Sequence, residues 1–108
     1  MILRRSERFD IDLERQFRWY LLDTGLDPIP ALALAERFAG VVSQTLDSLL
    51  LNPQMGRPRF VTFSNLPGIR SWRLEKPFNR FLIFYRVEGT VIFAERLLEG
   101  HRCLAGNR

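Results

Sequence analysis

The sequence predicts an α+β fold in which a helical hairpin packs on a small antiparallel sheet, within a single domain over residues 1–108. Two observations lead to this prediction. Apolar residues recur at helical spacing through the first half of the chain, and after the segment Asn52–Pro58 they alternate as they do in strands. A chain of 108 residues is long enough for one core between two layers.

The first helix is expected to begin after Ser6, which can cap it, and to end near Thr24–Gly25. Its apolar stripe consists of Phe9, Leu13, Phe17, Tyr20 and Leu21. Residues 2–5 precede it and are expected to add one strand to the sheet. We expect the acidic residues of both helices to face solvent.

The second helix is expected to start at Asp27 and to reach residue 51 or 52. Pro28 and Pro30 fall in its first turn, where a missing N–H costs little. Gly40 should cost up to about 1 kcal/mol relative to alanine unless it allows a close approach of the two helices. The short connection predicts an antiparallel helical hairpin.

Three strands follow, over residues 69–74, 81–87 and 90–98, with a turn at KPFN and a two-residue loop at Glu88-Gly89. This loop places Val87 opposite Thr90. One hairpin face then covers the helices. The other carries an apolar surface framed by arginines, which is typical of a protein-binding surface and which the tail can cover only in part. Its members are Arg80, Leu82, Phe84, Arg86, Val91, Phe93, Glu95 and Leu97.

Charge is distributed unevenly along a chain whose net charge is +4. Between residues 53 and 87 only Glu75 is acidic, and we expect an acidic or polyanionic partner to approach this segment. Its basic residues are Arg57, Arg59, Arg70, Arg73, Lys76, Arg80 and Arg86.

The remaining composition indicates a soluble, cytoplasmic protein without a cofactor or a bound metal. Cys103 is the only cysteine, which excludes an intrachain disulfide and a zinc cluster of cysteines. The N-terminus lacks the apolar core of a signal peptide, and no apolar run reaches membrane-spanning length.

The chain resembles the RelE/ParE superfamily of toxins from type II toxin–antitoxin systems. The resemblance covers most of the chain, and the strand LIFYRV is most similar to the ParE branch. It is carried by the two helices and, in order, by LNPQMGR (51–57), LPGIR (66–70), RFLIFYRV (80–87) and LLEGHR (97–102).

A ParE-like toxin is expected to inhibit DNA gyrase through protein binding and to be neutralised by a cognate, ParD-like antitoxin. Growth arrest would follow. The resemblance leaves open a homodimer or a hetero-oligomer with the antitoxin. It also leaves open an inactive, antitoxin-bound family member that acts only as a binding module.

The main alternative is a RelE-like endoribonuclease that cleaves mRNA on the ribosome. Catalysis would then fall to His101 with Arg80, Arg86 and Arg102. The family nuclease usually has an arginine where this chain has Leu82, and no tyrosine follows His101. These departures favour the gyrase inhibitor, for which we expect no catalytic residue.

The expected contacts with the target or the antitoxin combine the arginines with the apolar surface. From the sequence, we expect Phe84→Glu to weaken antitoxin binding without unfolding the protein. The full set of expected contacts is Arg70, Arg73, Arg80, Leu82, Phe84, Arg86, Phe93, His101 and Arg102.

Overall fold

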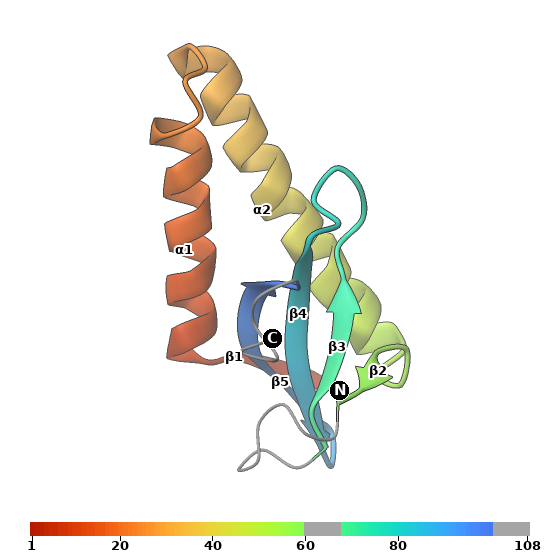
Figure 1. Cartoon of the computed structure of the whole chain (residues 1–108). Helices are drawn as coiled ribbons and strands as arrows, with labels where there is room; N and C mark the ends of the chain where they lie inside the picture. Colours follow the sequence, from red (N-terminus) through yellow and green to blue (C-terminus); the bar gives the residue numbers. More distant parts are fainter. Residues whose placement is uncertain (60–67, 101–108) are drawn as a thin grey trace.

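The computed structural model describes residues 1–59 and 68–100, which form a helical hairpin on one face of a five-stranded sheet (Figure 1). The predicted α+β class is therefore confirmed. The elements, in chain order, are β1 (Ile2–Arg5), α1 (Glu7–Leu22), α2 (Pro28–Leu51), β2 (Arg57–Pro58), β3 (Arg70–Arg73), β4 (Phe81–Glu88) and β5 (Val91–Glu99).

The N-terminus of α1 is fixed by Ser6, as the sequence predicts. Its hydroxyl accepts the backbone N–H of Phe9 at 3.0 Å and donates to the Glu95 carbonyl at 2.8 Å. One serine thus caps the helix and joins it to β5. The helix ends at Leu22, slightly before the predicted end, and Gly25 takes a positive φ of 81° in the connection.

The second helix begins at Pro28 after the capping residue Asp27 and ends at Leu51, as predicted. The Asp27 side chain makes no capping hydrogen bond. Gly40 is exposed, and apart from its chain neighbours and the helix's own backbone no heavy atom lies within 4 Å of the place where a Cβ would stand. The exception that a close approach of the helices would make does not apply, so the expected cost relative to alanine stands as a prediction.

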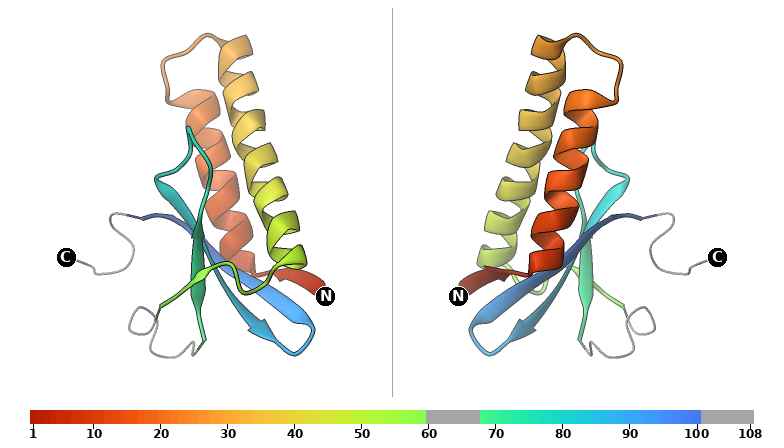
Figure 2. Two further views of the ribbon diagram at one scale, coloured as in Figure 1. Left: turned by 90° about the vertical axis from the view of Figure 1, so that its right-hand side faces the viewer. Right: turned by 90° about the vertical axis from the view of Figure 1, so that its left-hand side faces the viewer.

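The sheet has the order β1-β5-β4-β3-β2, and its β1 strand pairs in parallel with β5. All other neighbours are antiparallel. The predicted N-terminal strand is thus confirmed. The two helices lie together on one side of the twisted sheet, and the side that they leave uncovered is called the open face below (Figure 2).

The register of the β4–β5 hairpin differs from the prediction. Glu88 pairs with Val91, so the loop is Gly89-Thr90, and Gly89 adopts a φ of 58°. An irregularity next to Phe84 then shifts the pairing by one further residue. Because a one-residue shift exchanges the two faces of a strand, Leu97 lies in the helix-facing core with 4% exposure, and its predicted place on the open face is wrong.

An aromatic cluster forms the part of the core between the hairpin and the β3–β4 turn. Phe38 of α2 lies within 5.2–5.3 Å, between ring centroids, of Tyr20, Phe78 and Phe81. Phe78 belongs to the predicted turn KPFN, and only 1% of it is exposed. The turn therefore contributes a core residue.

Within the described residues, neither helix combines the length and apolar character needed to cross a membrane.

Candidate protein-binding surface

The centre of the open face is packed rather than exposed. Leu82 is 3% exposed and Phe84 is fully buried, and both pack with Ile69 and Leu98. Leu98 reaches this face because of the shifted register, which also places it opposite Leu82. The expectation that Leu82 and Phe84 form an exposed binding surface is therefore wrong, while Phe93 stays partly exposed.

Arg86 is neutralised on the open face by two carboxylates. Its Nε atom lies 2.7 Å from Glu95, its Nη1 atom pairs with Glu88, and its guanidinium lies 4.3 Å from the Phe93 ring centroid. Burial opposes the charge, but the hydrogen bonds and the charges of the two carboxylates outweigh it and raise the pKa of Arg86. This arginine is committed to the hairpin.

Arg80 stands at the other end of β4. Its Nε atom lies 3.4 Å from Glu99, its guanidinium lies 5.4 Å from the Phe81 ring centroid, and 55% of its side chain is exposed. Six residues of strand place Arg80 roughly 20 Å from Arg86 along β4. Arg80 and Arg86, two of the three arginines of the nuclease alternative, therefore do not converge on one phosphate. His101 and Arg102 lie outside the described residues.

Arg70 fastens the segment that follows α2 to the sheet. Its Nη1 atom donates to the carbonyls of Gly56 at 2.6 Å and Gln54 at 3.3 Å. Its partner across the strands, Tyr85, donates its hydroxyl to the Pro53 carbonyl at 2.8 Å. Arg70 thus has a structural role, and Tyr85 lies in the core.

Arg73 belongs to a second group of arginines at the β2–β3 edge. Its Nη1 atom donates to the Asn79 carbonyl at 2.5 Å, and the neighbouring Arg59 donates to the Ser71 hydroxyl at 2.7 Å. A groove of about 320 Å³, called the edge groove below, is lined by Met55, Arg57, Arg59, Ser71, Trp72, Arg73 and Leu82.

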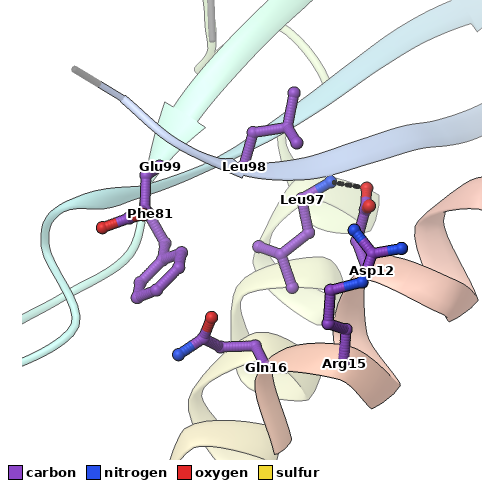
Figure 3. A pocket seen from close by; sticks show the side chains of 7 residues that line it. All are labelled: Asp12, Arg15, Gln16, Phe81, Leu97, Leu98 and Glu99. Carbon is purple, nitrogen blue, oxygen red and sulfur yellow. Dashed lines mark hydrogen bonds between the residues drawn. The ribbon is translucent and has the colours of Figure 1, made fainter. Parts of the chain in front are cut away.

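A cleft of about 380 Å³ lies between α1 and the end of β5, and the Asp12 carboxylate and Leu97, which both line it, are joined by a hydrogen bond (Figure 3). Asp12 accepts from Arg96 at 2.8 and 3.1 Å and from the Leu97 backbone N–H at 3.0 Å. The bond to Asp12 raises the pKa of Arg96 despite its partial burial. Since Asp12 is 8% exposed, the expectation that all acidic residues of the hairpin face solvent is wrong.

The sequence and the fold of this chain can be compared with those of known proteins. The family described as "ParE toxin of type II toxin-antitoxin system, parDE" matches residues 3–102. The chain belongs to this ParE toxin family. No curated protein sequence is similar enough to add to the comparison.

Two solved structures are similar to this ParE family member. A chain of the chromosomal ParDE toxin–antitoxin system from P. aeruginosa is 24% identical, with a TM-score of 0.65; the match covers 92% of this chain and 95% of that one. A chain of the intact E. coli RelBE toxin–antitoxin complex is 15% identical, with a TM-score of 0.49 and coverage of 91% and 94%. The first shows that the fold is shared.

The helical hairpin of this ParE family toxin exposes an apolar stripe whose residues were not among the contacts expected from the sequence. Along α1, Ile11 is 45%, Trp19 42% and Leu22 71% exposed, and a hollow of about 450 Å³ lies along them. Leu26 in the connection and Ile29 and Leu32 of α2 are also exposed. Exposed patches of this kind are typical of interaction surfaces.

Arg57 and Arg59 line the edge groove of this ParE family member. Both belong to the basic segment, but neither is among the contacts expected from the sequence. Their spacing of two residues was the available signal, because it places both side chains on one face of a strand. The strand itself was not predicted, since β2 has only two residues.

Proposed function

We propose that this ParE family toxin inhibits DNA gyrase by binding it, and that a cognate, ParD-like antitoxin neutralises it. The observation that carries the proposal is that Arg80 and Arg86 are paired with carboxylates and lie far apart. Arg86 is paired with two carboxylates, Arg80 is paired with Glu99, and the length of β4 separates them. A phosphate-cleaving site needs converging, available cations, whereas a protein-binding inhibitor does not.

The exposed apolar stripe supports the proposed antitoxin complex. Trp19 combines a large apolar area with partial exposure, and such residues often dominate binding energy at protein interfaces. We propose that the antitoxin covers the stripe along α1 and reaches the sheet. Gyrase acts on chromosomal DNA, so the proposal also requires that the toxin works in the cytoplasm.

We keep all the contact residues expected from the sequence in the proposed binding surface of the sheet, and we divide them into residues that touch the partner and residues that shape the surface. Arg73, Arg80 and Phe93 offer exposed atoms to a partner. His101 and Arg102 stay in the proposed set and lie outside the described residues. Leu82, Phe84, Arg70 and Arg86 shape the surface from below or from within the hairpin.

The experiment compares both activities with one purified preparation. Toxin separated from its co-expressed antitoxin is added to gyrase with relaxed plasmid and, in parallel, to ribosomes programmed with mRNA. We expect supercoiling to be inhibited, mRNA to stay intact, and added antitoxin to restore supercoiling. Codon-positioned mRNA cleavage that His101→Ala abolishes would instead establish the nuclease.

Growth measurements after expression in bacteria test toxicity separately from antitoxin binding. Expression in bacteria should stop growth with filamentation and induction of the DNA-damage response. A chain that binds the antitoxin tightly but inhibits neither gyrase nor translation would be an inactive binding module.

A further inference from the structure

The arginines of the edge groove differ in their partners from the five described arginines that pair with a carboxylate. Arg59 and Arg73 donate to a serine hydroxyl and a backbone carbonyl, which hold the side chains but leave the charge uncompensated. For Arg57, Arg59 and Arg73, the described residues supply no carboxylate within ion-pair distance. Carboxylates pair with Arg5, Arg18, Arg80, Arg86 and Arg96.

The three guanidiniums share the open face of the sheet. Arg57 pairs with Ser71 across the strands, and Arg73 lies two residues further along β3, so the side chains of Arg57, Ser71 and Arg73 point to one side. Since β2 pairs only with Arg70 and Ser71, it ends before it reaches Arg73. The edge groove lies where β2 ends and β3 continues without it.

The groove also has an apolar lining. Met55, Trp72 and Leu82 contribute to its walls, Trp72 is 39% exposed, and none of the described residues that line it is acidic. An apolar wall beside three cations is poorly matched to a nucleic-acid backbone, whose contacts are almost wholly with charge. It matches a peptide that carries both carboxylates and apolar side chains.

We infer that the edge groove binds an extended acidic peptide segment, whose carboxylates pair with Arg57, Arg59 and Arg73 while an apolar side chain packs on Met55 and Trp72. Alternate side chains of an extended peptide point the same way, so acidic residues at every second position meet the arginines. The inference rests on the proposed function only in naming the antitoxin as the source of such a segment.

The test measures binding of a short fluorescent peptide that alternates glutamate with leucine to the purified full chain. We expect the triple variant R57Q/R59Q/R73Q to lose on the order of tenfold or more in affinity, because charged contacts at an interface are lost. A control variant, R8Q/R15Q/R37Q, removes the same charge from exposed helical arginines and should bind like the wild type. A peptide with glutamine in place of glutamate should not bind.

Loss of folding is controlled by a milder variant. Within the described residues, the Arg57 side chain makes no hydrogen bond or ion pair, so Arg57→Gln should leave the unfolding free energy unchanged and still weaken peptide binding by a few-fold. Equal binding by the wild type and Arg57→Gln, or equal effects of the two triple variants, would overturn the inference. So would tighter binding of a short DNA duplex that depends on the same arginines.

Failure of this inference can be told from failure of the proposed function. The peptide assay uses the isolated chain and needs neither gyrase nor antitoxin. Gyrase inhibition with no peptide binding would overturn the groove alone, whereas peptide binding without gyrase inhibition would overturn the proposed target alone.

Discussion

The backbone N–H of Gly56 donates to the Tyr85 hydroxyl at 2.8 Å, and a Cβ atom on Gly56 would lie 2.6 Å from Cε1 of the same ring. The tyrosine therefore occupies the space that a side chain would need. It also donates to Pro53, so one phenol holds both ends of the turn between α2 and β2. This turn positions Arg57 and Arg59 at the start of the edge groove.

Gly56→Ala should destabilise the protein by about 2–4 kcal/mol, because the methyl group overlaps a fully buried ring and displaces its hydrogen bond. Urea unfolding followed by circular dichroism measures the change. An alanine variant as stable as the wild type would show that the turn can move away from Tyr85.

Gly40→Ala should act in the opposite direction and stabilise the protein by up to about 1 kcal/mol. The position is exposed inside α2 and has open space around it, so the methyl group restricts the unfolded chain without a clash. The same urea experiment measures it. A loss of stability here would point to an interaction that the helix makes through its bare backbone.

Asp12→Ala should destabilise the protein by about 2 kcal/mol or more, since it leaves the Arg96 guanidinium and the Leu97 N–H without their acceptor. Arg96→Met in the same chain should recover part of this loss, because the unpaired cation is gone. A double-mutant cycle on unfolding free energies tests this. Strictly additive losses would mean that the two side chains are not coupled.

Alkaline pH should destabilise the fold through its two tyrosines. Burial raises the pKa of both Tyr20 and Tyr85 above the ordinary value near 10 in spite of neighbouring arginines. A raised folded-state pKa means that the unfolded chain ionises first, so their contribution is complete below about pH 10 and is lost as pH rises through the folded pKa.

Phenolate absorbance during a pH titration measures these two groups directly. Both should ionise at higher pH in the native protein than in urea, and Tyr85→Phe should remove one of the two late transitions. Ionisation of a tyrosine at its ordinary pH in the native protein would contradict the burial.

Phe84→Glu should unfold the protein or destabilise it by about 3 kcal/mol or more, which reverses our expectation from the sequence. The side chain is fully buried beside Ile69 and Leu82, where a carboxylate would lose its hydration. Thermal unfolding measures this. Phe93→Glu is the matched change at a partly exposed position and should be milder.

Local patterns in the sequence determined most of the architecture. Helical periodicity, Ser6 and the two prolines were sufficient to predict both helices, and alternation predicted β3, β4 and β5, because these signals act between residues a few positions apart. The family resemblance added the expected function. The basic segment was also visible, although its arginines could not be sorted by role.

Tertiary structure alone decided the register and the state of each arginine. The shift beside Phe84 accompanies contacts such as Ser6 with Glu95 and Asp12 with Leu97, which join residues more than eighty positions apart. That shift carries Leu97 into the core and Leu98 onto the open face. Arg86 is neutralised by two carboxylates, whereas Arg73 has no carboxylate partner among the residues that the structure describes. This difference depends on which distant groups the folded sheet brings to each arginine, and no local pattern contains that information.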